Sequence, residues 1–456
     1  MKKKEKSVDS VFRFGRMADT RTKGCGNSMK ISTLAHAAIL PLALLPGLAL
    51  ATNGYFSHGY GVKSQGMAGV GIALPQDGLA AATNPAGTSF VGDRVDLGLV
   101  WFMPNRNAEI SGNSAMTPMG PTSLNGSYNA NDSKNFFIPE IGYIKHISPE
   151  LTASVAVYGN GGMNTDYGRS PFQAFSPVPL GSGGVDLSQL FISPSLAFKV
   201  AENHSLGIAL NLAYQRFRIT GIQPFAAFGV SSDPANFTNN GYDSSVGWGA
   251  RLGYTGKITP ELTLGATWAS KTYMGEFDKY RGLFAEQGGF DIPSNFGVGL
   301  AWKALPALTV AFDYQRILYN DIKSIANPIE NLTVYRNLFG TDNGPGFGWK
   351  NVSVYKLGAS YEIGDWTLRG GYSYVTEPIP DSQTFLNIYA PGTVQNHLTL
   401  GATWANGKTG ELSVSYMHAF KDTVKGSGSI PAGFGSGEAN IEMYQNSVGI
   451  AYGWKF

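Results

Sequence analysis

Three basic side chains stand out as groups that could do chemistry. Arg251, Lys271 and Lys356 lie in segments in which apolar and polar residues alternate, and each occupies a polar position. Alternation of this kind places successive side chains on opposite faces of a β-strand. On the face away from the apolar residues, a guanidinium or ammonium group could bind the carboxylate of a small molecule.

Two carboxylates share this placement. Glu140 and Asp313 lie about seven or eight residues from the nearest short turn, as Arg251 and Lys356 do, so these four groups are predicted to form one charged ring. In one interpretation, the cations of the ring bind a substrate carboxylate. In the other, the charges are structural and join an internal segment to the surrounding wall. The sequence leaves both interpretations open.

Catalytic and metal chemistry have little support. Five of the six histidines, His58, His146, His204, His397 and His418, accompany many Ser and Asp residues, which a hydrolase could use. However, the chain contains neither a G-x-S-x-G nor an H-E-x-x-H motif. We therefore predict a protein that is not an enzyme and that needs no metal or cofactor.

The composition indicates which elements position these residues. Charged residues make up 14% of the 456 residues, aromatic residues make up 12%, and there are 59 glycines. Several soluble domains would need about twice that share of charge. A helical membrane protein would need apolar runs of about 18 or more residues, and the only run near that length lies at the start. A transmembrane β-barrel fits, because its strands alternate instead.

The first 51 residues are predicted to be a signal peptide. Nine Lys and Arg residues precede an uncharged run, residues 31–51, which ends in Ala49-Leu50-Ala51, a typical cleavage pattern. Residues 1–28 are either a long extension or the result of a misplaced start. Cleavage would remove Cys25 with nine basic and three acidic residues, which changes the net charge from +2 to −4. The exported protein would have no disulfide and no basic surface for nucleic acid.

Residues 94–456 are predicted to form fourteen strands. Six short turns alternate with seven long loops, the pattern of outer-membrane barrels with short turns in the periplasm and long loops outside. The last strand alternates most clearly and ends at Phe456, which resembles the signal recognised by the barrel assembly machinery. The long loops are predicted at about residues 104–133, 161–188, 221–243, 275–290, 321–350, 378–393 and 423–439.

Residues 52–93 do not alternate. This segment is rich in Gly and Ala, and about 40 residues cannot bury a hydrophobic core of their own. We therefore predict that it is a hatch, or plug, inside the lumen of the barrel.

The sequence resembles the FadL/TodX family of outer-membrane transporters for hydrophobic compounds. The resemblance covers essentially the whole chain after the signal peptide. Its most specific part is Asn84-Pro85-Ala86, which matches the family's N-P-A motif at the end of the plug. The other matching features are G-M-A-G-V-G-I-A at residues 66–73, D-G-L-A-A-A-T-N-P-A at residues 77–86, the fourteen strands and the terminal Phe456.

The resemblance implies energy-independent uptake of long-chain fatty acids or small hydrocarbons. Solutes would be captured by the outer loops and, after hatch movement, released sideways into the membrane through a kink in the third strand. That strand is predicted at residues 151–160. The cluster Gly159, Gly161 and Gly162 either supplies its irregular backbone or marks the start of a flexible loop. The candidates for capture are the loop residues Phe225, Phe228, Phe237, Phe284 and Phe290, whose rings either bind the solute or pack on one another.

Two other functions are compatible with a barrel. A general diffusion porin would lack the plug, and an outer-membrane lipid hydrolase would need a catalytic Ser and His together. We expect a monomer in the bacterial outer membrane that contacts membrane lipid and lipopolysaccharide.

Overall fold

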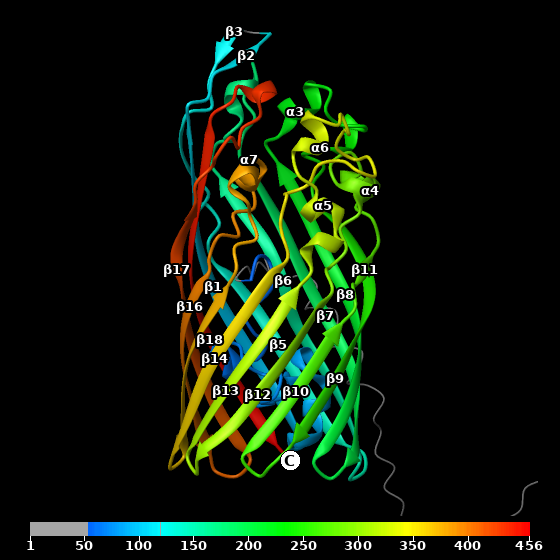
Figure 1. The fold of residues 1–456 in the computed structure, drawn as a ribbon, viewed down its shortest axis with the longest axis vertical. Helices are drawn as coiled ribbons and strands as arrows, with labels where there is room; N and C mark the ends of the chain where they lie inside the picture. Colours follow the sequence, from blue (N-terminus) through cyan, green and yellow to red (C-terminus); the bar gives the residue numbers. More distant parts are fainter. Residues whose placement is uncertain (1–52, 119) are drawn as a thin grey trace, which may run out of the picture. The chain divides into compact units, whose positions relative to one another are not determined.

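The computed structural model describes residues 53–118 and 120–456, so the predicted signal peptide with Cys25 lies outside the described residues. Fourteen long strands dominate the structure (Figure 1). These strands are β1 (Arg94–Ser111), β5 (Phe136–His146), β6 (Leu151–Tyr167), β7 (Gly183–Ala201), β8 (His204–Thr220), β9 (Asp243–Lys257), β10 (Leu262–Ala269), β12 (Asn295–Leu305), β13 (Leu308–Ile317), β14 (Val352–Ile363), β15 (Trp366–Val375), β16 (Asn396–Asn406), β17 (Gly410–Val424) and β18 (Glu438–Lys455).

These strands close into one antiparallel barrel. Each strand pairs with its neighbours along the chain, and the ring closes where β1 pairs with β18, from Arg94 opposite Lys455 to Ser111 opposite Glu438. Closure leaves the barrel without a free edge strand, which a bilayer would not tolerate. The predicted fourteen-stranded barrel is confirmed.

The two ends of the barrel carry different connections (Figure 1). At one end, six turns of two to four residues join the strands. At the other end, seven long loops contain short helices and short strands. These are β2 (Ala115–Thr117), β3 (Gly120–Thr122), β4 (Gly126–Asn129), η3 (Gln173–Phe175), α3 (Gln223–Ala227), η4 (Pro234–Asn236), β11 (Tyr273–Met274), η5 (Asp278–Tyr280), α4 (Ala285–Gly288), η6 (Tyr319–Asp321), α5 (Lys323–Ala326), α6 (Glu330–Thr333), η7 (Asp381–Gln383), α7 (Thr384–Asn387) and η8 (Ala432–Phe434).

Two strands extend further toward the long loops than predicted. β1 continues to Ser111 and β6 to Tyr167, beyond the predicted loop starts at residues 104 and 161. In β1 the pairing continues, but the outward residues Asn105, Asn107 and Glu109 are polar. Apolar alternation therefore ends before the hydrogen-bonded ladder does.

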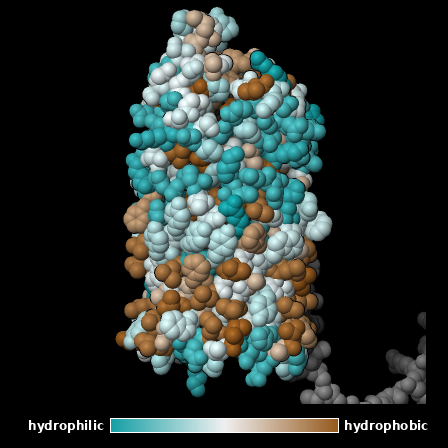
Figure 2. All heavy atoms as spheres, in the orientation of Figure 1, coloured by the Kyte–Doolittle hydropathy of each residue, from teal (hydrophilic) through white to brown (hydrophobic). Residues whose placement is uncertain are grey.

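The outward face forms an apolar band near the short-turn end (Figure 2). Large apolar side chains such as Ile208 on β8 and Trp366 on β15 are about half exposed there, at 53% and 49%. Among the described residues, no helix is long and apolar enough to cross a membrane. The barrel wall itself presents the surface that suits hydrocarbon.

Residues 53–93 lie inside the lower part of the barrel, drawn in blue in Figure 1. They form the short helices α1 (Val62–Gln65) and α2 (Ala80–Thr83) and the 3-10 helix η2 (Pro85–Phe90). α1 contacts β16, β17 and β18, whereas η2 contacts β7, β8 and β9. We call residues 53–93 the plug, because most of them are buried inside the barrel.

The wall contacts the plug through glycines. A Cβ atom on Gly207 of β8 would lie 2.2 Å from the backbone nitrogen of Ala86, and one on Gly253 of β9 would lie 2.0 Å from Asn84 Oδ1. Both separations are too short for a real Cβ atom, so a side chain here would displace the plug backbone at Gly207 and the Asn84 side chain at Gly253. The plug is therefore seated directly on the inner surface of the strands.

We predict that Gly207→Ala destabilises the folded barrel by about 1 to 3 kcal/mol, the usual cost of overpacking. Gly98→Ala is the matched control, because a Cβ at this inward position of β1 would make ordinary contacts at 3.5 Å. Urea unfolding in lipid vesicles, followed by tryptophan fluorescence, measures both variants. Equal stability of the two variants would contradict the direct seating of the plug.

Candidate functional site

An apolar pocket lies among the long loops. It contains about 560 Å³ of space that atoms do not fill, part of it open to solvent. Several loops contribute to it, so it exists only when they fold together. Its lining consists of Phe172, Phe217, Ile219, Ile222, Phe225, Phe237, Leu283, Phe284, Ser324, Phe339, Pro345, Gly346, Phe347, Leu386 and Tyr389.

The five predicted capture residues separate into three groups. Phe225, Phe237 and Phe284 line the pocket and are buried. Phe228 lies outside the lining, is 39% exposed and packs edge-on against Phe175, with ring centroids 5.7 Å apart. Phe290 is also buried outside the lining, and its ring centroid lies 4.9 Å from that of Phe284.

The lining of the pocket carries no charge. Its side chains are apolar except for two hydroxyl groups, those of Ser324 and Tyr389. The Ser324 hydroxyl donates to the backbone oxygen of Gly289 at 2.6 Å, and burial raises the pKa of the Tyr389 phenol well above its ordinary value. A neutral, apolar ligand would therefore bind there without desolvating a charged group.

A chain of aromatic rings joins this pocket to the plug. The ring centroid of Phe290 lies 6.3 Å from that of Tyr55, which is the third described residue of the plug. The Tyr55 ring in turn lies 5.3 Å from Phe56 and 5.4 Å from Tyr319. Aromatic contacts therefore continue from the loops to the start of the described plug.

The start of the plug meets an irregular part of β6. Between Gly159 and Gly161 the pairing of β6 with β7 shifts register, and residues 158–163 are all buried instead of alternating. Gly162 donates its amide hydrogen to the oxygen of Tyr55 at 3.0 Å, and Ser57 donates to the oxygen of Asn160 at 2.8 Å. The glycine cluster singled out from the sequence therefore lies at a bulge that contacts the plug backbone.

The wall pairing is interrupted at the same place. β5 pairs with β1 up to Phe136 opposite Phe102. Its pairing with β6 starts at His146 opposite Thr152 and ends at Ile141 opposite Val157. Residues 136–140 of β5 thus have no β6 partner in the described ladder, which leaves an unpaired stretch in the barrel wall.

A buried arginine that no sequence pattern indicated lies at the long-loop end of the unpaired stretch of β5. Arg106 of β1 is 1% exposed. Its guanidinium donates to the oxygen of Asn164 on β6 at 2.7 Å, and to the backbone oxygens of Ala130 and Ser133 in the loop before β5 at 3.1 Å and 2.5 Å. Arg106 therefore holds two strands and a loop together beyond the unpaired stretch.

The four predicted ring charges contact the plug. The amides of Gly71 and Ile72 donate to Asp313 at 2.8 Å and 3.0 Å. Lys356, opposite Asp313 across β13 and β14, donates to the oxygens of His58 and Gly69 at 3.0 Å and 3.2 Å. These contacts support the structural interpretation, in which wall charges satisfy polar groups of the plug.

The other two ring residues behave similarly. The amide of Gly61 donates to Glu140 Oε1 at 3.2 Å. Arg251 donates to the oxygen of Thr83 at 3.2 Å and to Thr267 Oγ1 at 3.4 Å. Its Nε has no hydrogen-bond partner among the described residues, although the side chain is buried beside a small pocket lined by both polar and apolar residues.

Lys271 does not share the lumen with Arg251. Its ammonium group pairs with Asp291 at 2.8 Å and lies 4.9 Å from the ring of Tyr273, an outward residue that is 54% exposed. The cause is a bulge: Ala269 pairs with Arg251, but Tyr273 pairs with Trp248, so the two strands differ by one residue between these pairs. Such an insertion reverses the faces beyond it, and the prediction of a lumen position is corrected.

Asn84 of the N-P-A sequence fastens the end of the plug. Its side-chain nitrogen Nδ2 donates to the backbone oxygens of Ile72 at 2.7 Å and Tyr254 at 2.9 Å, and to Thr255 Oγ1 at 3.1 Å. Its side-chain oxygen accepts the amide hydrogen of Ala86. One side chain thus joins two parts of the plug to β9.

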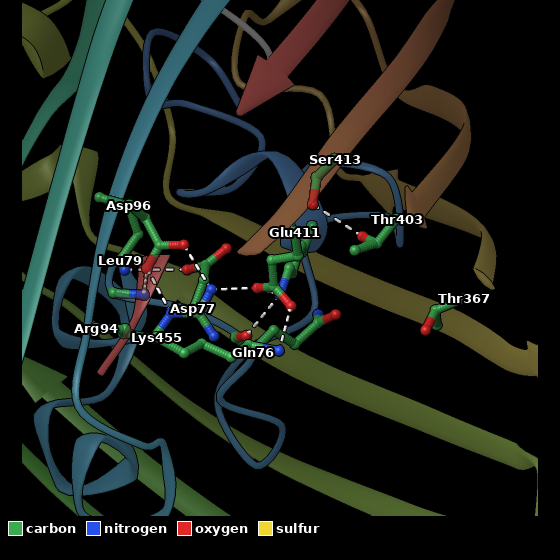
Figure 3. A network of polar contacts seen from close by, with 12 residues as sticks. Gln76, Asp77, Leu79, Arg94, Asp96, Thr367, Thr403, Glu411, Ser413 and Lys455 are labelled. Carbon is green, nitrogen blue, oxygen red and sulfur yellow. Dashed lines mark hydrogen bonds and ion pairs between the residues drawn. The ribbon is translucent and has the colours of Figure 1, made fainter. Parts of the chain in front are cut away.

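A charged network fastens another side of the plug (Figure 3). Glu411 of β17 contacts Lys63 of α1 and Arg94 of β1, and it pairs with Lys455 of β18 at 2.7 Å. Arg94 also pairs with Asp96 at 2.6 Å. The network therefore joins the plug to β17 and to β18 and β1, the two strands whose pairing closes the barrel.

Comparison with known proteins identifies similar sequences and folds. A family described as "Outer membrane protein transport protein (OMPP1/FadL/TodX)" matches residues 48–433. The toluene transporter TodX of Pseudomonas putida has 18% identity and a TM-score of 0.66, with 88% of this chain and 99% of that chain covered. No match was found among curated proteins.

Two further solved structures have the same fold. A FadL homologue of Pseudomonas aeruginosa has 16% identity and a TM-score of 0.67, with 88% of this chain and 100% of that chain covered. The toluene transporter TbuX of Ralstonia pickettii has 19% identity and a TM-score of 0.59, with 88% and 99% covered. At these identities the likeness concerns the fold.

We predict that Asp313→Ala destabilises the seated plug by about 3 to 5 kcal/mol, because it leaves two plug amides unpaired and the buried charge of Lys356 uncompensated. The double variant Asp313→Ala/Lys356→Met should recover part of that loss. Hydrogen exchange at the amides of Gly71 and Ile72 and urea unfolding report the effect. Strictly additive losses in the double variant would show that the two charges act independently.

Proposed function

The chain belongs to the OMPP1/FadL/TodX family of outer membrane transport proteins, and from this premise we propose that it takes up small hydrophobic compounds without an energy source. The observation that carries the proposal is the uncharged aromatic pocket in the long loops, joined by contacting rings to the plug and to the irregular part of β6. The pocket is the capture site of the proposed path.

The physical need for such a path follows from the solute. Moving one CH₂ group of a hydrocarbon from water to an apolar site is favourable by about 0.8 kcal/mol. A water-filled channel has no such apolar site, so a hydrocarbon gains little by entering it. A lipopolysaccharide leaflet also hinders direct entry. An apolar capture site outside and an exit into hydrocarbon together solve this problem.

We propose that the solute leaves sideways between β5 and β6. The unpaired residues 136–140 of β5 and the bulge at Gly159, Gly161 and Gly162 support an exit at this position. The plug residues Tyr55 and Phe56 lie against the bulge, so a small displacement of these residues would connect the aromatic chain to the wall.

The proposed movement involves the start of the plug and not the whole plug. Residues beyond Ser57 are fastened by Asp313, Lys356, Asn84 and the Glu411 network. Leaving such buried polar groups unpaired costs about 1 to 3 kcal/mol each, which makes ejection of the whole plug unfavourable. Residues 53–57 instead make mainly aromatic and backbone contacts.

Two substrate classes fit the proposed path. The relatives TodX and TbuX are described as toluene transporters, and the uncharged pocket suits such neutral rings. A long-chain fatty acid would also need a partner for its carboxylate. Arg251 is the best candidate in the lumen, because its Nε is unpartnered among the described residues and its side chain lines a small pocket.

We predict that a strain lacking this protein loses uptake of labelled toluene, labelled oleate or both, and that the gene restores it. Comparing the two solutes in one strain identifies the substrate class. Liposomes containing the purified protein should swell slowly in small sugars, because the plug fills the lumen. Rapid swelling without hydrophobic uptake would instead identify a general diffusion porin.

A second prediction concerns the carboxylate. If fatty acids are carried, Arg251→Ala should reduce oleate uptake about tenfold, because a charge-assisted hydrogen bond is worth about 1.5 to 3 kcal/mol, and should leave toluene uptake unchanged. Lys271→Ala is the control, since Lys271 pairs with Asp291 away from the lumen. Equal losses of both solutes in the Arg251 variant would rule out a carboxylate site at this residue.

A further inference from the structure

An apolar groove lies on the outer surface of the barrel, away from the pocket in the long loops and from the proposed transport path. Strands β7, β8 and β9 and the short strand β11 form it. Most of the side chains that line it point outward, such as Leu212 at 43%, Val246 at 70% and Trp248 at 58% exposure. The groove is lined by Leu190, Ile192, Leu210, Leu212, Ala213, Tyr214, Val246, Gly247, Trp248, Tyr273, Met274 and Gly275.

Cationic side chains lie directly beyond this groove on the long-loop side. Arg216 and Arg218 follow Tyr214 along β8 on the same outward face, and two residues of a strand span about 7 Å. Both guanidinium groups lie over the ring of Tyr242, at 4.2 Å and 4.7 Å from its centroid. Lys279 joins them, because its ammonium group donates to the backbone oxygen of Tyr242 at 2.7 Å.

The two nearby carboxylates accept hydrogen bonds from other groups, although Asp186 Oδ1 has no hydrogen-bond partner among the described residues. Asp186 accepts the hydroxyl hydrogen of Tyr242, and Asp243 accepts the amide hydrogens of Ser244 and Lys279. Within the part of the chain that the structure describes, neither Arg216 nor Arg218 forms an ion pair. Stacking on the ring positions each guanidinium group and leaves its N–H edge for an oxyanion.

We propose that the groove and the Arg216, Arg218 and Lys279 cluster bind lipopolysaccharide, the phosphorylated glycolipid of the outer leaflet. An acyl chain would lie in the groove, and a phosphate of the headgroup would bind the two arginines. Charge complementarity selects this occupant, because a cation cluster at the headgroup side of an apolar groove matches a lipid that carries both phosphates and acyl chains. The site is separate from the lumen and does not depend on the proposed transport function.

The test is a titration of purified protein in detergent micelles with diphosphoryl lipid A. Wild-type protein should bind it about tenfold or more tightly than the variant Arg216→Gln/Arg218→Gln, since charge-assisted hydrogen bonds would be lost. The matched control is Lys303→Gln/Lys408→Gln, which removes two exposed cations at the short-turn end and should bind as wild type does. Native mass spectrometry counts the bound lipid.

Two further arms identify the source of affinity. Lipid A without phosphates, and phosphatidylethanolamine, should bind wild-type protein as weakly as diphosphoryl lipid A binds the arginine variant. Leu212→Trp, which fills the groove, should also weaken lipid A binding, whereas inorganic phosphate alone should not compete at millimolar concentration. Equal lipid A binding by wild type and the arginine variant, or equal binding of phosphate-free and diphosphoryl lipid A to wild type, would overturn the proposal.

Discussion

The structure depends on direct contact between the plug backbone and the inner wall of the barrel. Glycines at wall positions such as Gly207 and Gly253 permit a separation at which any Cβ atom would overlap the plug. At that separation, wall side chains reach the polar backbone groups of the plug, as Asp313 reaches the amides of Gly71 and Ile72. A segment too short to build a core of its own is thereby held in place.

This constraint divides the plug into two parts. The part from His58 onward is fixed by side chains from many strands, including Glu411 where the barrel closes, and by Asn84 near η2. The first described residues, 53–57, contact aromatic rings and the bulged backbone of β6. The part held by aromatic and backbone contacts therefore lies next to the unpaired stretch of the wall, which is the arrangement that the proposed lateral exit needs.

Much of the architecture follows from patterns visible in the sequence. Alternation and turn spacing predict the fourteen strands, because each strand separates lipid from lumen. The same alternation fails where the backbone is irregular: the bulge before Tyr273 reverses the face of Lys271. Arg106 was missed because β1 continues into a segment whose outward residues are polar, so alternation of apolar residues does not mark it. The pocket depends on packing among loops distant in sequence, which no local pattern encodes.

The central claim is that solutes pass while most of the plug stays in place. Ser89 of η2 and Ser205 of β8 lie with their hydroxyl oxygens 3.0 Å apart, so Ser89→Cys/Ser205→Cys should form a disulfide between plug and wall. Cys25, the only native cysteine, lies in the predicted signal peptide. Uptake of the labelled solute by this variant, oxidised and then reduced, is the most direct measurement. The account predicts equal uptake in both states, whereas loss of uptake on oxidation and recovery on reduction would contradict it.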